Sequence, residues 1–275
     1  MRLKDSVAIV TGGGGGLGEG ISVCLSREGA HVVVSDLSLE LAEKVAAEVK
    51  KTGQKSLAIQ TDVSKADQCE KLVQTTVDEM GKVDILVCSA GVSGVTHREH
   101  DPDAPLTLES VTEDDWNLTM DVNLKGVFLC NRAVATHFRE QNSGKIINIS
   151  SVGGRKGSPL LFAYSISKAA VIALTQAVAQ QLAPFSVNVN AICPGIIYTP
   201  MWEAGAKLLV KLHPMLKGSG LSPEEAANLM VQNQIAFKRM QTPEDIGNAA
   251  VFLASEEAKE ITGQALNVCG GMHFS

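Results

Sequence analysis

The sequence lacks a long hydrophobic run, an excess of positive charge and more than a few aromatic side chains. No apolar run approaches the roughly 20 residues of a membrane-spanning helix, and no apolar signal-peptide core follows the N-terminus. The net charge of −6 argues against general affinity for nucleic acid or anionic membranes. We therefore expect a soluble, cytoplasmic protein that acts on a small molecule, with no nucleic-acid or membrane partner.

Cysteines are few and lie far apart. None of the six falls at the spacing of a metal-binding motif, and several lie inside apolar runs. Buried, reduced thiols in a cytosolic protein are the simplest interpretation. We therefore expect no metal site. The six are Cys24, Cys69, Cys88, Cys130, Cys193 and Cys269.

Glycine is frequent instead, with 25 residues, and the apolar runs are short and rich in Val, Ile and Ala. Such runs suit strands that are buried on both faces under closely packed helices. They alternate with helical patterns, which predicts an α/β fold: a single doubly wound, parallel, Rossmann-like sheet of about seven strands with helices on both faces. We expect strands at 7–10, 31–35, 56–60, 83–88, 145–149, 187–192 and 265–268. We expect helices at 39–50, 66–80, 116–138, 162–182 and 243–254, and one that ends near residue 28.

No repeat or low-complexity linker divides the chain, so we expect one domain over residues 1–275. Residues 93–112 are polar and contain prolines, as in a surface excursion, and His97 and His100 within them lack the partners of a metal site. Residues 200–240 form an insertion that mixes apolar side chains with lysines. We interpret it as a lid over the substrate. A pair of helices packed on the body or on a neighbouring subunit is the alternative.

Five consecutive glycines follow the first expected strand, in Thr11-Gly-Gly-Gly-Gly-Gly-Leu-Gly18. Glycines at the start of a helix let the backbone approach a pyrophosphate, whose charge the free helix amides favour. Two registers fit this loop. Gly13, Gly15 and Gly18 match the G-x-G-x-x-G fingerprint. The wider spacing T-G-x-x-x-G-x-G is matched instead by Gly12, Gly16 and Gly18.

Asp36 closes the second expected strand, 18 residues after Gly18. A carboxylate at this place accepts hydrogen bonds from a ribose 2′-hydroxyl and repels a 2′-phosphate. No Arg or Lys lies in the glycine loop to bind that phosphate, so we expect NAD rather than NADP. Capping of the next helix is the alternative role for Asp36. Asp62 and Val63 follow the third strand and could reach an adenine edge, although an Asp there is also a common helix cap.

Tyr164 and Lys168 lie one helical turn apart and therefore project from the same face of the expected helix. A cation beside a phenol lowers the pKa of the phenol from its usual value of about 10. Ser151 ends the apolar run of the fifth strand and brings a hydroxyl to the same region. The three groups together could move a proton on and off an alcohol. Alone, the Tyr-x-x-x-Lys pair also describes a half-buried Tyr beside a solvated Lys.

The wide-spaced glycine loop, the Ser and the Tyr-x-x-x-Lys pair together resemble the short-chain dehydrogenase/reductase family, over nearly the whole chain. The resemblance implies that Asn123 is the fourth catalytic residue beside Ser151, Tyr164 and Lys168. It implies that Lys168 also holds the nicotinamide ribose and that Thr199 contacts the nicotinamide carboxamide. The residues expected to bind NAD are Gly12, Gly16, Leu17, Gly18, Asp36, Asp62, Val63, Ala90, Gly91, Tyr164, Lys168, Pro194, Gly195 and Thr199.

One departure from the family pattern stands after the fourth strand. The family usually has Asn-Asn-Ala-Gly there, whereas this chain has Cys88-Ser89-Ala90-Gly91. Ser is shorter than Asn, so hydrogen bonds that brace the sheet or touch the adenosine ribose are expected to be lost or mediated by water.

The resemblance implies an NAD-dependent oxidoreductase that interconverts a secondary alcohol and a ketone, on a small, diol or cyclic substrate, with Tyr164 as general acid and base. It also implies a homotetramer formed through the two long helices and the last strand. A hydroxyacyl-CoA dehydrogenase is the first alternative, with Arg155 and Lys156 holding the CoA phosphates. These two charges could equally be solvated. A non-catalytic NAD-binding subunit is the second alternative.

Overall fold

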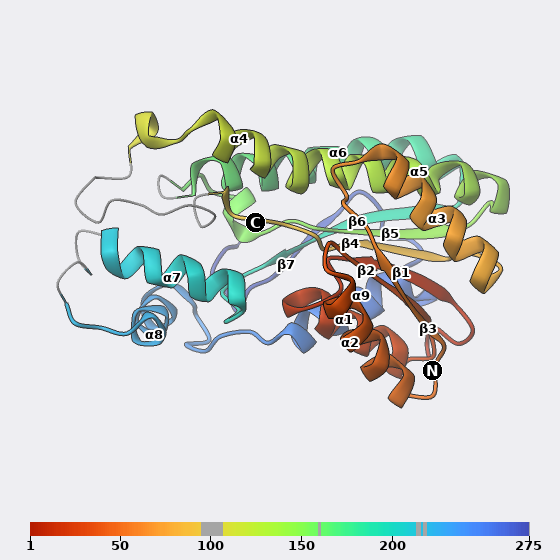
Figure 1. Cartoon of the computed structure of the whole chain (residues 1–275), viewed down its shortest axis with the longest axis horizontal. Helices are drawn as coiled ribbons and strands as arrows, with labels where there is room; N and C mark the ends of the chain where they lie inside the picture. The colour runs from red at the N-terminus through yellow and green to blue at the C-terminus, as the bar shows by residue number, and fades with distance from the viewer. Residues whose placement is uncertain (95–106, 159–160, 213–215, 217–218, 275) are drawn as a thin grey trace.

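The computed structural model in Figure 1 describes residues 1–94, 107–158, 161–212, 216 and 219–274. His97 and His100 lie outside the described residues. The described chain contains seven strands in one parallel sheet, in the order β3-β2-β1-β4-β5-β6-β7. The predicted fold class is therefore confirmed. The strands are β1 Val7–Thr11, β2 His31–Asp36, β3 Ser56–Gln60, β4 Ile85–Cys88, β5 Gly144–Ile149, β6 Val187–Pro194 and β7 Ala265–Val268.

Helices cover both faces of this sheet (Figure 1). On one face, α1 (Gly16–Arg27), α2 (Leu39–Lys51) and α9 (Pro243–Ala254) pack on a core that includes Val10, Val34 and Ile192. On the other, α3 (Ala66–Met80), α5 (Gly126–Gln141) and α6 (Phe162–Leu182) pack on a core that includes Ile9, Leu86 and Ile146. Strands buried on both faces explain the continuous apolar runs in the sequence.

The sheet order changes direction between β1 and β4, because β2 and β3 lie to one side of β1 and the later strands to the other. Ligands of open parallel sheets bind at such a switch point, outside the carboxyl ends of the strands. The glycine loop follows β1 and the Ala90-Gly91 pair follows β4, so both lie at this edge.

The segment predicted as one helix over 116–138 is three pieces. Helix α4 spans Glu113–Met120, a π-helical turn (η3) spans Asp121–Lys125, and α5 follows. Helix α4 begins earlier than predicted because Thr112 caps it. The Thr112 hydroxyl accepts from the amide of Asp115, and the Asp115 carboxylate accepts from the amide of Thr112. A π turn widens the helix at one point and is frequent at functional sites. It contains Asn123.

The expectation that no apolar stretch reaches membrane-spanning length is wrong for one segment. Phe162–Phe185, which contains α6, is long and apolar enough by length and composition. Core helices of soluble proteins pass the same test. Here α6 buries Val171 and Leu182 against the sheet and also carries Tyr164 and Lys168. Its hydropathy is therefore explained by its place in the core.

Candidate active site

The glycine loop leaves little room for side chains at most of its positions. Gly12 and Gly16 have φ of +61° and +53°, in the left-handed region that residues with a side chain rarely adopt. A Cβ added at Gly18 would overlap the carbonyl oxygen of Gly12, whereas one at Gly15 would meet nothing. A Cβ at Gly13 would also be crowded, 2.8 Å from a Val34 methyl group. The open space at Gly15 and the positive φ of Gly12 and Gly16 are therefore what favour the wider-spaced register, Gly12, Gly16 and Gly18.

Helix α1 begins beside this loop with its first amides uncapped. Its N-cap residue, Gly15, makes no side-chain capping bond. Amides of a first helical turn lack partners within the helix and attract anions. Leu17, in the same turn, packs on the core below and anchors the helix. The loop and helix start thus form a cradle with the shape and charge that a pyrophosphate requires.

Asp36 is bonded to the glycine loop rather than capping a helix. One of its carboxylate oxygens accepts from the amide of Gly14 at 3.0 Å and the other from the amide of Ser38 at 3.0 Å. The cap of α2 is Ser38, whose hydroxyl accepts from the amide of Leu41. Each carboxylate oxygen has a second lone pair, so Asp36 can still accept from a ribose hydroxyl.

Asp62 and Val63 lie beyond the end of β3. Asp62 accepts from both the amide and the hydroxyl of Ser64, at 2.9 and 2.7 Å. The cap position of α3 is Lys65, so Asp62 orders the turn before the helix rather than capping it. Val63 is buried against Gly126, where an added Cβ would lie 2.8 Å from a Val63 methyl group. Both residues therefore have structural partners beside any contact with a nucleotide.

Two side chains meet behind Gly91, the second residue of the Ala90-Gly91 pair. A Cβ at Gly91 would lie 3.4 Å from both the Asn123 side-chain oxygen and the Lys168 ammonium. Asn123 is fully buried, accepts from the amide of Val92 at 2.7 Å and donates to its carbonyl at 2.8 Å. Its side chain therefore holds the loop after β4, and no bond to Lys168 is present among the described residues.

Ser151, Tyr164 and Lys168 lie together at the end of β5 and the start of α6. A hydrogen bond links Ser151 and Tyr164, and the Lys168 ammonium lies 5.7 Å from the centre of the Tyr164 ring. Lys168 is 3% exposed and donates to the carbonyl of Ile149 at 2.8 Å. Strand β5 thus supplies the acceptor that fixes the ammonium, and the loop directly after it supplies the hydroxyl of Ser151.

Burial dominates the protonation of this group of residues. It raises the pKa of the Tyr164 phenol, and the hydrogen bond from Ser151 only partly opposes the rise. Burial also lowers the pKa of Lys168 to about 8. The pKa of Tyr164 is therefore raised and not lowered as expected, and Lys168 is not among the groups that shift it.

Cys88, which replaces an expected Asn, takes part in a buried polar chain that the sequence did not reveal. The amide group of Asn131 donates to the Cys88 sulfur at 3.4 Å and to Asn148 at 2.9 Å. Asn148 in turn donates to Thr175 at 3.1 Å. These bonds brace β4, β5, α5 and α6 across the sheet. The sequence offered one signal of this chain, which was the presence of polar residues inside otherwise apolar helices and strands.

Pro194 ends β6, Gly195 follows it, and Thr199 directly precedes helix α7 (Pro200–Leu212). A Cβ added at Gly16 would lie 3.5 Å from a methyl carbon of Thr199. The Thr199 hydroxyl accepts from the amide of Trp202 at 3.3 Å. The segment after β6 therefore faces the glycine loop across the edge of the sheet, which brings the two ends of the expected cofactor site together.

The insertion over 200–240 contains α7 and α8 (Pro223–Gln234), which pack on each other. Val231 and Ile235 bury against Ile196, with Trp202 beside them. This is the packed helical pair of the alternative interpretation. Figure 1 places both helices beyond the carboxyl ends of the strands, so they also border the site.

Arg155 is not a free surface charge. Its guanidinium donates to the carbonyl of Ala265 on β7 and lies against the buried thiol of Cys193. Lys156 is exposed. Of the two charges expected to meet CoA phosphates, only Lys156 is therefore in a position to do so without rearrangement.

Comparisons with known proteins agree with this geometry. A family model described as short chain dehydrogenase matches residues 6–207. The chain is 37% identical over its full length to the full length of a 3-oxoacyl-[acyl-carrier-protein] reductase of Staphylococcus aureus. It is 32% identical to a (2S)-[(R)-hydroxy(phenyl)methyl]succinyl-CoA dehydrogenase subunit of Thauera aromatica, with 98% of each chain covered.

Solved structures give the same result. The crystal structure of NAD+-bound xylitol dehydrogenase superimposes with a TM-score of 0.89 at 30% identity, covering 98% of this chain and all of that one. Levodione reductase superimposes with a TM-score of 0.87 at 32% identity, with 98% of each chain covered.

Proposed function

The chain belongs to the short-chain dehydrogenase family of oxidoreductases, which act on alcohol and ketone substrates, and from this premise we propose that it is an NAD-dependent enzyme that interconverts a secondary alcohol and a ketone. The proposal rests above all on the position of Ser151, Tyr164 and Lys168, which lie together. Lys168 lies behind Gly91, and the neighbouring Ala90 packs against Gly12 of the glycine loop. A small, diol or cyclic substrate is proposed.

The residues present fit a dinucleotide. Gly12, Gly16 and Gly18 allow a tight loop that side chains at these positions would strain or obstruct, and the uncapped start of α1 favours a pyrophosphate. Asp36 supports NAD, because its carboxylate would repel a 2′-phosphate and accept from a 2′-hydroxyl. Asp62, Val63, Ala90 and Gly91 would hold the adenosine half. When bound, the nicotinamide supplies the hydride donor or acceptor.

We propose that Pro194, Gly195 and Thr199 would hold the nicotinamide half, on the side of the site opposite the glycine loop. Lys168 would also reach the ribose on this half. Leu17 contributes by fixing the helix start, since its side chain packs into the core.

Tyr164 is proposed as the group that exchanges a proton with the substrate oxygen. Its pKa is raised by burial, so the phenol keeps its proton at neutral pH and can donate it during ketone reduction. For alcohol oxidation the phenolate must accept the proton, which alkaline pH favours. Ser151 holds the substrate oxygen against Tyr164, and Lys168 supplies the nearby positive charge. Asn123 acts as a positioning residue that holds the loop carrying Gly91.

A screen of initial rates tests this function. Purified protein is assayed for NADH formation with secondary alcohols, diols and 3-hydroxyacyl-CoAs, and in parallel with NADP in place of NAD. The proposal expects turnover with a secondary alcohol and preference for NAD. Turnover that requires NADP would contradict the cofactor assignment.

Hydroxyacyl-thioester oxidation is the alternative that the relatives favour. Both an acyl-carrier-protein reductase and a CoA-ester dehydrogenase subunit are similar over nearly the full chain. In this alternative Lys156 rather than Arg155 meets a CoA phosphate, because Arg155 is bonded to Ala265. It predicts a KM that rises with salt and on Lys156→Ala. If neither added salt nor Lys156→Ala changes the KM for a 3-hydroxyacyl-CoA, this alternative is excluded.

We also propose a cytoplasmic homotetramer. Helices α5 and α6 expose Phe128 and Ile166, and β7, at the edge of the sheet, exposes Leu266. These apolar side chains suit contact with further copies of the chain. Light scattering on the purified protein distinguishes a tetramer from a dimer.

A further inference from the structure

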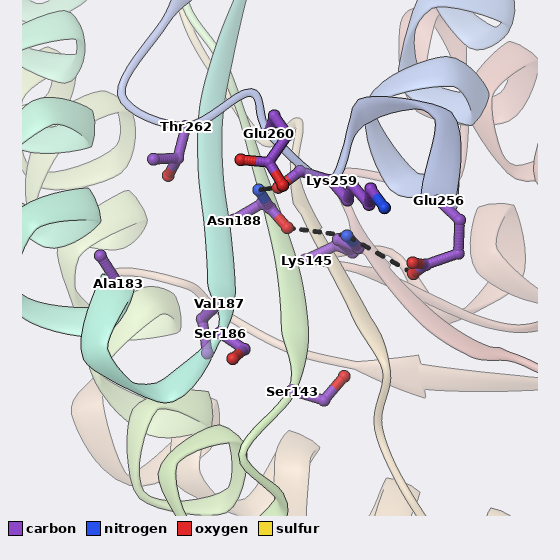
Figure 2. Close-up of a pocket in the computed structure, with 10 residues that line it drawn as sticks. All are labelled: Ser143, Lys145, Ala183, Ser186, Val187, Asn188, Glu256, Lys259, Glu260 and Thr262. Atoms are coloured by element: carbon purple, nitrogen blue, oxygen red, sulfur yellow. Dashed lines mark hydrogen bonds and ion pairs between the residues drawn. The ribbon is translucent and has the colours of Figure 1, made fainter.

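A polar pocket opens at the amino ends of β5 and β6, the sheet edge opposite the candidate active site. Its volume is about 380 Å³, within the range of about 300 to 1,000 Å³ that small-molecule sites occupy. None of the proposed catalytic or cofactor-binding residues lines it. The lining residues, all shown in Figure 2, are Ser143, Lys145, Ala183, Ser186, Val187, Asn188, Glu256, Lys259, Glu260 and Thr262.

Lys145 brings a largely buried positive charge to this pocket. Its side chain is only 12% exposed, and its ammonium donates to the side-chain oxygen of Asn188 at 2.7 Å. That oxygen is held in place, because the Asn188 amide group donates to the carbonyls of Lys259 and Ile261. Figure 2 shows the ammonium between Asn188 and Glu256.

The charge of Lys145 is weakly compensated. The carboxylate of Glu256 lies 3.8 Å away, beyond hydrogen-bond distance, on a side chain that is 85% exposed. Burial lowers the pKa of Lys145 more than Glu256 raises it. An ammonium has three donors, and within the described chain only Asn188 accepts a hydrogen bond from this one. A largely buried ammonium that lacks a close counter-charge is stabilised by an anion that binds to it in place of Glu256.

Further polar groups of the pocket are available to a ligand. The hydroxyls of Ser143 and Ser186 make no hydrogen bond to the described residues, and the side chain of Lys259 is exposed and forms no ion pair with them. Glu256 and Glu260 stand at the rim. They would repel a free anion but would attract an ammonium group on the same ligand.

We propose that this pocket binds the carboxylate or phosphate group of a small molecule, with Lys145 as the cationic anchor. Ser143 and Ser186 supply additional donors, and Glu256 moves aside when the ligand enters. A ligand that also carries an ammonium group gains from Glu260. The site is separate from the proposed reaction and does not depend on it.

Binding is measured by calorimetry with two probes, inorganic phosphate and glycine, each against sodium chloride at equal ionic strength. Lys145→Gln is expected to weaken binding at least about tenfold, as expected for loss of a charged hydrogen bond. Glu256→Gln is expected to tighten phosphate binding, because it removes the competing carboxylate. Lys44→Gln, an exposed lysine on α2, is the matched control and leaves affinity unchanged. The probe that binds more tightly shows whether the pocket favours a phosphate or a carboxylate on a molecule that also carries an ammonium group.

Three results would overturn the proposal. The first is wild-type protein that binds neither probe at millimolar concentration. The second is equal affinity of wild type and Lys145→Gln. The third is Glu256→Gln protein that binds phosphate no more tightly than wild type. The last measurement decides the question even if Lys145→Gln fails to fold, since Glu256 is exposed and its replacement leaves the core intact.

Discussion

The side-chain amide of Asn123 donates a 3.1 Å hydrogen bond to the hydroxyl of Ser167, and both residues are fully buried. The same hydroxyl donates to the carbonyl of Tyr164 at 2.7 Å. Ser167 directly precedes Lys168. It therefore joins the π turn, and through Asn123 the loop after β4, to the helix that carries the proposed catalytic pair.

Removal of this hydroxyl is expected to slow the reaction. In Ser167→Ala we expect kcat to fall about tenfold, since small displacements of a reacting group can cost up to about a hundredfold. The KM for NAD should change less than kcat, because the hydrogen bonds of the Ser167 hydroxyl lead to Asn123 and Tyr164 and not to the glycine loop or Asp36. Ser165→Ala is the matched control: its buried hydroxyl lacks a partner among the described residues, so kcat should stay near wild type. Equal kcat in the two variants would contradict the positioning role.

Two glycines of the same loop should differ sharply in how well the protein tolerates their replacement by alanine. Gly18→Ala forces a methyl group into the carbonyl of Gly12, so we expect loss of NAD binding and a lower melting temperature. Gly15→Ala meets no atom and should keep near-native stability. Thermal unfolding with and without NADH measures both effects. A loop in which Gly15→Ala is the more damaging change would contradict the register.

Asp36 is expected to set the cofactor preference. Asp36→Asn keeps the size of the side chain and removes its charge, so the ratio of kcat/KM for NAD over NADP should fall by about tenfold or more, the effect of about 1.4 kcal/mol. Asp62→Asn serves as the control, since Asp62 is proposed to meet the adenine, which NAD and NADP share, so its loss should leave the ratio unchanged. A ratio unchanged in Asp36→Asn would remove the basis for the NAD assignment.

Lys168 should make stability depend on pH. Its pKa falls from 10.5 to about 8 in the folded protein, so between these values Lys168 binds more protons in the unfolded chain and its contribution to stability rises with pH. The gain is at most about 3 kcal/mol. In Lys168→Met, chemical denaturation should show a smaller rise over pH 8 to 10 than in wild type, while the exposed Lys44→Met should match wild type. An equal rise in Lys168→Met would show that Lys168 is not the group responsible.

The sequence predicted the sheet, its order of elements and most helix ends, because those features follow from local patterns. The helix at Phe162–Leu182 was predicted to the residue, and the strand–helix alternation predicted the parallel sheet. The place of Asp36 at the end of β2 was predicted as well, but its hydrogen bond with the amide of Gly14 was not.

What the sequence could not predict depends on contacts between distant residues. The π turn at Asn123 breaks an otherwise regular helical pattern, and its partners Val92 and Ser167 lie 31 and 44 residues away. Arg155 looked like a loop charge, yet its partner Ala265 lies 110 residues away. The direction of the Tyr164 pKa shift depends on burial, which the Tyr-x-x-x-Lys spacing does not report.

The central claim is that Tyr164 exchanges a proton with the substrate while the rest of the site binds the dinucleotide. Tyr164→Phe tests it most directly, with initial rates of NADH formation measured beside the Kd for NADH from fluorescence titration. The account predicts that turnover falls by at least about a hundredfold, in the range for loss of a general acid or base, with the Kd changed little. A Tyr164→Phe protein that turns over at the wild-type rate would contradict the account.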